Sequence, residues 1–353
     1  MFVDILFILV ILITAFIFFD ENSRKKDSMV IWVYVSVIFC LAMMAAFRPI
    51  GIDKDSLTYL SYYEGSSAES LLDLLEPSFV LISSLAGLLG DVRVLFVVYA
   101  LLAIPVMAYG ITRLTDLWFL SLLIWVSHYF LIQDMTQIRV AVSTGLFVFA
   151  LKYLAEKDRW RYAACMAGAV FFHFSAVLLC PFMLLGRKRL TVFYRIVLFA
   201  LPLFFYFLYV RGIDILTYLP VSMFQERREV YETLRDQGVA GDEINVFNAY
   251  ALIRLLTYYM LLWKYDVVVE KFESLTLLIK IMCVSICLYA GLAFLPALAI
   301  RSSEVCGVVD ILLIPWLAYT VRPFWLGKVL VAFFGVILFL YNIYVSEYLQ
   351  LTM

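Results

Sequence analysis

The sequence predicts an all-α, polytopic membrane helix bundle, and composition, run length and backbone chemistry support this. Of the 353 residues, 65% are hydrophobic and 16% are charged, whereas soluble domains carry about 45–50% apolar and about 25% charged residues. The apolar residues fall in continuous runs of about 17–24 residues, the length at which a helix spans hydrocarbon. Every backbone N–H and C=O in hydrocarbon must be paired within its own segment, so these runs fold as helices.

Basic residues at the ends of the first runs set their direction across the membrane. Residues 2–19 lack a basic start and are not followed by a small-residue cleavage site, which indicates an uncleaved span rather than a signal peptide. Three basic residues follow at 24–26, and the positive-inside rule places them in the cytoplasm and the N-terminus outside. The second span, residues 30–47, then returns to the outer face, so the acidic segment 48–76 lies outside.

The remaining runs bring the total to about ten spans plus two short re-entrant helices. Residues 77–90 are apolar but too short to span, which is typical of a re-entrant helix. Residues 162–185 either form a helical hairpin that enters from the cytoplasm or place the basic cluster 186–190 outside, and we favour the hairpin. The other expected spans are 92–111, 117–132, 138–154, 192–210, 247–263, 275–295, 307–321 and 325–345.

These runs predict one integral membrane domain, residues 1–353. Both termini are expected outside. The two larger extracytoplasmic loops are residues 48–76 and 211–247.

Charge and motif content exclude several classes of function. The net charge is −1, so no basic patch indicates nucleic acid binding. The chain lacks HExxH, P-loop, GxSxG and GxGxxG motifs. Cys283 and Cys287 are one helical turn apart, but no histidine or carboxylate joins them, so they are interpreted as small buried apolar residues. We therefore expect no metal site and no cofactor.

The functional prediction rests on four arginines. A charge at membrane depth is costly and therefore marks a functional candidate. Arg254 lies about two turns from the outer end of its run. The other three, Arg48, Arg139 and Arg301, lie at outer helix ends, where the head group also reaches the interface. Guanidinium forks suit bidentate contact with phosphate oxygens, so four on one side indicate a bound pyrophosphate. The rival interpretation is an internal ion-pair network with Asp53, Asp55, Glu76 and Glu304.

Other ionisable side chains accompany these arginines. Asp53, Asp55 and Glu76 belong to the outer segment 48–76, which holds six acidic and two basic residues. His173 lies in an apolar run, where a histidine is more often a core residue than a catalyst. Tyr59, in the same segment, offers an aromatic face either for a sugar ring or for helix packing.

Several motifs occur in a recognisable order. They are RPIGIDKD at 48–55 with Tyr59, EPSF at 76–79, QIR at 137–139 and FFHFSA at 171–176. Their order and spacing resemble the EpsG-like family of Wzy-type polysaccharide repeat-unit polymerases. The motifs cover about residues 45–185, and the hydropathy pattern covers the whole chain. The sequence departs from the family pattern at Val140, where a second glutamine is expected, and the C-terminal half aligns only loosely at Arg254 and Arg301.

The resemblance implies a metal-independent glycosyltransferase of the bacterial cytoplasmic (inner) membrane, with its active site facing the periplasm or extracytoplasm. Such a polymerase transfers a growing glycan from undecaprenyl pyrophosphate to a new lipid-linked oligosaccharide repeat, as in O-antigen, capsule or exopolysaccharide synthesis. Its partners would be that lipid-linked oligosaccharide, the lipid bilayer and a chain-length regulator protein.

The resemblance also implies residue roles. Arginines would stabilise the leaving pyrophosphate, and one acid or histidine would take the acceptor's proton. The catalytic candidates are Glu76, Asp55, Asp53 and His173. The acids come first because segment 48–76 lies on the expected side of the membrane, and Glu76 and Asp55 rank about equally. The substrate-binding candidates are Arg48, Arg139, Arg254, Arg301, Gln137 and Tyr59.

Three other functions stay open from the residues alone. An O-antigen ligase or other lipid-carrier glycosyltransferase needs the same arginines and the same outer site, so only the motifs separate it. A flippase or transporter of the lipid-linked glycan predicts charges along a path through the membrane centre, whereas these charges gather towards one face. A structural assembly subunit would not need the four arginines.

Overall fold

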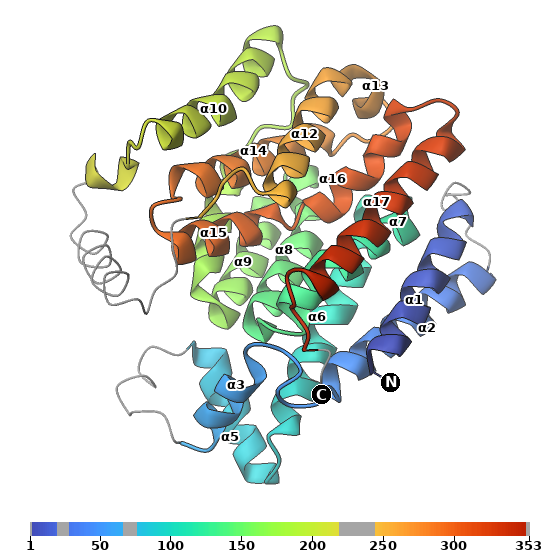
Figure 1. Ribbon diagram of the computed structural model, residues 1–353, viewed down its shortest axis with the longest axis vertical. Coiled ribbons are helices and arrows are strands. Elements are labelled where there is room, and N and C mark those ends of the chain that lie inside the picture. Colours follow the sequence, from blue (N-terminus) through green and yellow to red (C-terminus); the bar gives the residue numbers. More distant parts are fainter. Residues whose placement is uncertain (1, 20–27, 66–75, 219–243, 351–353) are drawn as a thin grey trace. The chain divides into compact units, whose positions relative to one another are not determined.

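The structure is a computed structural model that describes residues 2–19, 28–65, 76–218 and 244–350. These residues are mostly helical, with turns and loops between the helices and one isolated β-bridge, which confirms the predicted all-α membrane bundle (Figure 1). They form two compact units. The core unit comprises residues 1–183 and 311–353, and the inserted unit comprises residues 184–310.

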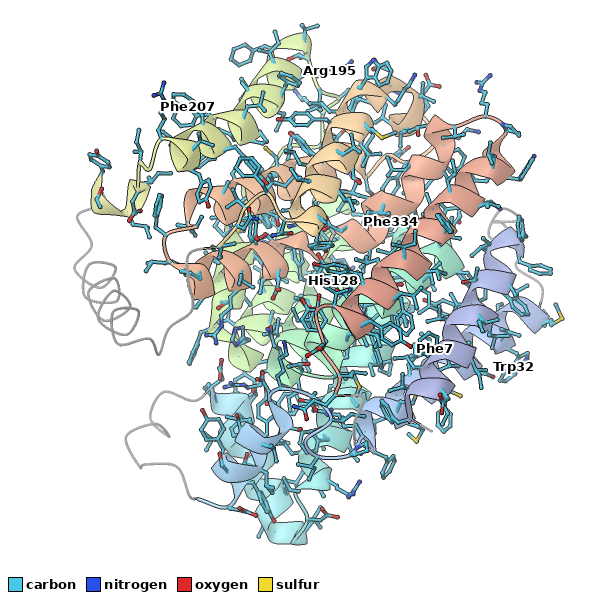
Figure 2. The ribbon with its side chains drawn as sticks, in the orientation of Figure 1. Phe7, Trp32, His128, Arg195, Phe207 and Phe334 are labelled. Atoms are coloured by element: carbon cyan, nitrogen blue, oxygen red, sulfur yellow. The ribbon has the colours of Figure 1, made fainter. Side chains whose placement is uncertain are left out.

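Six helices of the described residues are long and apolar enough to cross a membrane. Five belong to the core unit: α1 with its 3₁₀ extension (Phe2–Phe19), α2 (Ser28–Ala46), α6 (Arg93–Leu114), α8 (Ile138–Glu156) and α17 (Phe324–Tyr344). The sixth is α10 of the inserted unit (Val192–Val210), whose bounds match the predicted span. Large aromatic side chains such as Trp32 on α2 and Phe207 on α10 project from these helices and are 69% and 51% exposed (Figure 2). Such surfaces suit contact with lipid.

Shorter elements complete the core unit. Its remaining elements are α3 (Ser56–Tyr63), α5 (Pro77–Leu89), α7 (Trp118–Ile124), the π-helical η2 (Trp125–Asp134), α9 (Arg159–Phe172), η3 (Phe174–Leu184), α16 (Asp310–Trp316) and η5 (Leu317–Thr320). The predicted outward run 117–132 is therefore the short α-helix α7 followed directly by the π-helical η2. Long π-helical stretches are rare and often mark functional sites.

Helices α6 and α8 pack closely against each other. Gly110 of α6 faces α8 so closely that a Cβ there would lie 2.9 Å from the backbone nitrogen of Phe149. Gly145 of α8 makes the reverse approach, since a Cβ there would lie 3.2 Å from the carbonyl oxygen of Ala103. Small residues let the backbones of two membrane helices approach closely. Such close packing matters in a membrane, because the hydrophobic effect does not drive helices together in lipid.

Replacing Gly110 by alanine is therefore expected to destabilise the core unit by about 1–3 kcal/mol, since the added methyl group must push α8 away. Thermal unfolding in detergent measures this loss. Gly87→Ala is the matched control, because nothing lies within 4 Å of a Cβ at Gly87. Equal melting temperatures for the Gly110 and Gly87 variants would contradict this packing.

The segment 162–185 reverses direction at His173, as the hairpin interpretation expects. His173 is extended, with φ −155° and ψ 122°, and it separates α9 from η3. The Tyr162 hydroxyl near the start of α9 donates a 2.7 Å hydrogen bond to the Leu179 carbonyl. A chain that continued straight would carry Leu179 beyond the reach of Tyr162, because helices rise about 1.5–2 Å per residue. His173 therefore lies at the tip of the α9–η3 hairpin.

The end of α17 and the start of α1 lie at the same end of the core unit as the loop after α2. Phe7 and Tyr344 contact each other with ring centroids 6.4 Å apart. The backbone nitrogen of Gln350 donates a 2.7 Å hydrogen bond to the Ile52 carbonyl, beside the bridge between Asp53 and Leu349. This arrangement agrees with both termini lying on the side of segment 48–76.

Two α-helices of the inserted unit, α13 (Tyr265–Val269) and α15 (Pro296–Gly307), were not predicted. The elements of this unit are α10, η4 (Ile215–Tyr218), α12 (Ala249–Trp263), α13, α14 (Leu275–Gly291) and α15. The predicted span 275–295 stops at Gly291, where the Phe205 ring packs so closely that a Cβ would lie 2.6 Å from it. A new helix then starts at Pro296, because proline suits the first helical position. Most of the predicted outer loop 211–247 lies outside the described residues.

Candidate functional site

Three side chains from separate segments of the core unit meet at one point. The Glu76 carboxylate uses Oε1 to contact Nδ1 of His173 at 2.6 Å. Its Oε2 forms an ion pair with Nη1 of Arg139. The Glu76 and Arg139 side chains are 5% and 20% exposed, and that of His173 is 14% exposed, so the group is enclosed without being sealed.

Local sequence explains how each of the three side chains reaches this point. Glu76 precedes Pro77, which disfavours helix at the preceding residue, so Glu76 is extended (φ −64°, ψ 145°) at the start of α5. Arg139 is the second residue of α8. His173 leaves the helical path at the tip of the α9–η3 hairpin. The ends of three helices, α5, α8 and α9, thus meet at this point.

Aromatic rings flank the guanidinium of Arg139. The Arg139 Cζ lies 5.8 Å from the Tyr59 ring centroid and 5.4 Å from the Phe79 ring centroid. Tyr59 is 3% exposed and packs on Phe79, so the two rings join α3 to α5. Burial raises the pKa of Tyr59 to about 12 even though the charge of Arg139 opposes the shift. The Tyr59 hydroxyl is therefore protonated at neutral pH and can donate to a ligand.

The pKa of the Glu76 carboxyl lies below its ordinary value of 4.5. Burial by itself would raise the pKa, but the hydrogen bond from His173 and the charge of Arg139 outweigh burial. Because the folded-state pKa is lower than the unfolded one, the cluster stabilises the fold above the unfolded pKa. That contribution is lost as the pH falls through the folded-state pKa.

Acidification should therefore loosen α5 from α9 only below about pH 4.5. Hydrogen exchange of the α5 amides as a function of pH measures this, and Glu76→Gln should remove the acid transition. A transition that begins above pH 5, or one that persists unchanged in Glu76→Gln, would show that another group controls the contact.

Arg48 and Asp53 form a separate buried ion pair. The Arg48 Nε lies 2.9 Å from Asp53 Oδ2, and both side chains are 0% exposed. Arg48 also donates to the Ala45 carbonyl and lies 4.2 Å from the Phe96 ring centroid. The other oxygen of Asp53 accepts from the backbone nitrogen of Ser56 at 2.9 Å and so caps α3. This is the geometry that the ion-pair interpretation predicts.

Asp55 and Gln137 lie at the edges of the cluster. Asp55 is half-buried at the start of α3, one turn before Tyr59. Gln137 is half-buried at the start of α8, two residues before Arg139. Both positions are compatible with contact to a ligand held by Arg139.

Arg254 is buried in the inserted unit. Its Nε lies 2.6 Å from Oδ2 of Asp310, and its Nη atoms donate to Ser303 at 3.1 Å and to Ser285 at 2.8 Å. Asp310 is 0% exposed. Asp310 was not among the predicted residues, although an acid inside the apolar run 307–321 was the signal that could have identified it. Arg301 lies on α15 and is exposed.

The predicted residues therefore fall into three groups. Glu76, Arg139, His173 and Tyr59 come together. Arg48 and Asp53 pair with each other. Arg254 and Arg301 belong to the other unit, so the meeting of all four arginines at one pocket stays a prediction.

The cysteines and acids form no metal centre in the described ranges. No group of three or more His, Cys, Asp or Glu side chains there could hold a metal ion. All six cysteines are free. Cys283 and Cys287 are both buried, as the apolar interpretation expects.

Comparison with known proteins identifies the family. No curated protein and no solved structure matches the chain. The family model described as the EpsG family matches residues 31–352, nearly the whole chain, and it includes every motif of the site. The chain therefore belongs to the EpsG family of polymerase-type membrane proteins of polysaccharide biosynthesis.

Proposed function

We propose that this protein is a Wzy-type polymerase that transfers a growing glycan from undecaprenyl pyrophosphate to a new lipid-linked repeat unit. The observation that carries the proposal is the cluster of Glu76, Arg139 and His173, which joins a cation for the pyrophosphate to a histidine–carboxylate pair. Family membership supports the same class of reaction. The site would face the periplasm or extracytoplasm of the bacterial inner membrane, and a chain-length regulator would be a further partner.

The geometry favours His173 over the acids as the proton acceptor. Both oxygens of Glu76 are engaged, by His173 and by Arg139. Nδ1 of His173 is held by Glu76, whereas Nε2 is shielded from solvent and has no hydrogen-bond partner among the residues that the structure describes. A carboxylate that holds one ring nitrogen orients the ring and stabilises the imidazolium that forms. Nε2 is then the basic atom available to a substrate hydroxyl.

The proposed transfer is a substitution at the anomeric carbon of the donor glycan. The acceptor hydroxyl gives its proton to Nε2 of His173, and its oxygen forms the new bond to the anomeric carbon. The bond from that carbon to the pyrophosphate oxygen breaks, and its electron pair leaves with the pyrophosphate. Arg139 stabilises the developing negative charge, and the step proceeds without a metal.

Deletion of the gene followed by analysis of surface glycan length tests the proposal. Loss of a polymerase leaves single repeats on the cell surface, loss of a flippase leaves none, and loss of a ligase leaves long chains on the lipid carrier. Arg139→Ala should reproduce the single-repeat result while the protein remains in the membrane. Long chains of normal length from Arg139→Ala would refute the proposed role of this site.

A further inference from the structure

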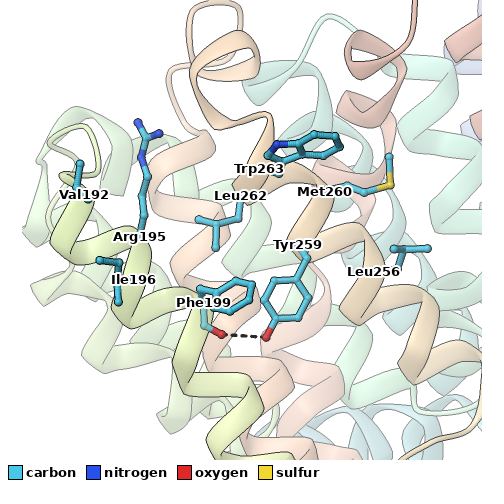
Figure 3. Close-up of a pocket in the computed structure, with 9 residues that line it drawn as sticks. All are labelled: Val192, Arg195, Ile196, Phe199, Leu256, Tyr259, Met260, Leu262 and Trp263. Carbon is cyan, nitrogen blue, oxygen red and sulfur yellow. Dashed lines mark hydrogen bonds between the residues drawn. The ribbon is translucent and has the colours of Figure 1, made fainter.

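The inserted unit contains an apolar groove between α10 and α12. The groove encloses about 610 Å³ and is lined by nine side chains, of which Arg195 and Tyr259 are the main polar ones (Figure 3). Its volume lies within the range of small-molecule sites, about 300–1,000 Å³. Arg195 and Trp263 stand on opposite sides of the groove, and Leu262 lies between them.

Two hydrogen bonds fix the closed end of the groove. The Tyr258 hydroxyl donates to the Leu198 carbonyl at 2.7 Å, and the Tyr259 hydroxyl donates to the Phe199 carbonyl at 3.0 Å. The start of α10 and the end of α12 form the other end of the groove. Val192 and Trp263 are 74% and 76% exposed, so the groove opens at this end to its surroundings.

The open end of the groove is strongly basic. The segments 186–195 and 264–280 around it contain seven basic residues and three acidic ones. The Arg195 guanidinium donates to both oxygens of Asp266, at 2.8 and 2.6 Å, and this ion pair fixes the position of Arg195 at the rim of the groove. Arg189 is exposed, and Lys264 lies with Nζ 4.3 Å from the centroid of the Trp263 ring. The excess positive charge at the open end is complementary to an anionic head group.

We propose that this groove binds an anionic membrane phospholipid, with one acyl chain between α10 and α12 and the phosphate near Arg189 and Lys264. Basic pockets between membrane helices on the cytoplasmic side are suited to anionic head groups. By the positive-inside rule the rim at 186–189 faces the cytoplasm, so the occupant comes from the inner leaflet. The proposal is independent of the proposed transfer reaction, which uses Glu76 and its partners in the core unit.

Quenching of tryptophan fluorescence by brominated lipids tests this binding on the purified full-length protein. Brominated phosphatidylglycerol should quench more strongly than brominated phosphatidylcholine at the same mole fraction. Trp263→Phe should remove the difference between the two lipids. Trp160→Phe should keep it, because Trp160 is 87% exposed on the core unit and is remote in sequence from the groove.

A charge variant measures the head-group contribution. Lys264→Gln should raise the half-saturating fraction of phosphatidylglycerol about fivefold, the effect of one basic residue at an anionic surface. Arg159→Gln is the control, since it also removes a basic residue beside an exposed tryptophan, and it should leave the half-saturating fraction unchanged. Equal quenching by both lipids, or equal shifts in both variants, would overturn the proposal. Displacement by unbrominated undecaprenyl phosphate but not by phosphatidylglycerol would also overturn it, because the occupant would then be the glycan carrier.

Discussion

Replacing His173 by alanine is expected to lower repeat-unit transfer by about 10²–10⁴-fold, the usual contribution of a general base. The reason is that Nδ1 of His173 is already held by Glu76, which leaves Nε2 to accept the acceptor's proton. The measurement is the length of surface glycan in a deletion strain that expresses the variant. The variant should still reach the membrane in normal amount, because His173 lies at a hairpin tip and not inside a helix.

Two acid variants separate the histidine from its rivals. Glu76→Gln should act in the same direction as His173→Ala, because the amide cannot stabilise the imidazolium or pair with Arg139. Asp55→Asn is the matched control from the same acidic segment, and it should leave chain length close to that of wild type. Single repeats from Asp55→Asn together with long chains from His173→Ala would reassign the base to Asp55.

Removing Arg254 is expected to destabilise the inserted unit by about 3–5 kcal/mol. Arg254→Ala removes the 2.6 Å ion-pair partner of Asp310, which is 0% exposed, and breaking a buried ion pair from one side carries a cost of this size. Thermal unfolding in detergent, together with the amount of protein in the membrane, measures the loss.

Arg301→Ala is the matched control on α15. Arg301 is exposed, and its removal should change the free energy of unfolding by no more than about 0.5 kcal/mol. The double variant Arg254→Met with Asp310→Leu should recover part of the loss, because it removes both buried charges. If Arg254→Ala melts like wild type yet yields single repeats, Arg254 contacts substrate and is not a structural residue.

The sequence predicts the helices well because hydrocarbon allows few alternatives. The apolar run 192–210 becomes α10 with the same bounds, and the short run 77–90 becomes α5, closed by Gly90 in the left-handed region at φ 71°. The interruption at Gly291 and the new helix at Pro296 were missed, because that break depends on the Phe205 ring from a distant helix. Composition averaged over a run does not contain such a contact.

The residues of the site were predicted from the sequence, but their contacts with one another were not, for a physical reason. Arg139, Glu76 and His173 were selected from motifs, but their mutual contact spans 63 and 97 positions and cannot be read from local spacing. The same holds for Arg254 and Asp310, 56 positions apart. A buried arginine looks alike in sequence whether it holds a phosphate or a carboxylate. For Arg48, Arg139 and Arg254 the structure shows carboxylates, those of Asp53, Glu76 and Asp310.

The central claim is that Arg139 holds the pyrophosphate of the lipid carrier beside Glu76 and His173. The most direct test is the affinity of the purified protein for undecaprenyl pyrophosphate and for the uncharged undecaprenol, in wild type and in Arg139→Ala. We expect the variant to lose about 10–100-fold in affinity for the pyrophosphate, the value of a charge-assisted hydrogen bond, and to bind undecaprenol as wild type does. Equal affinity of both proteins for the pyrophosphate would contradict the account.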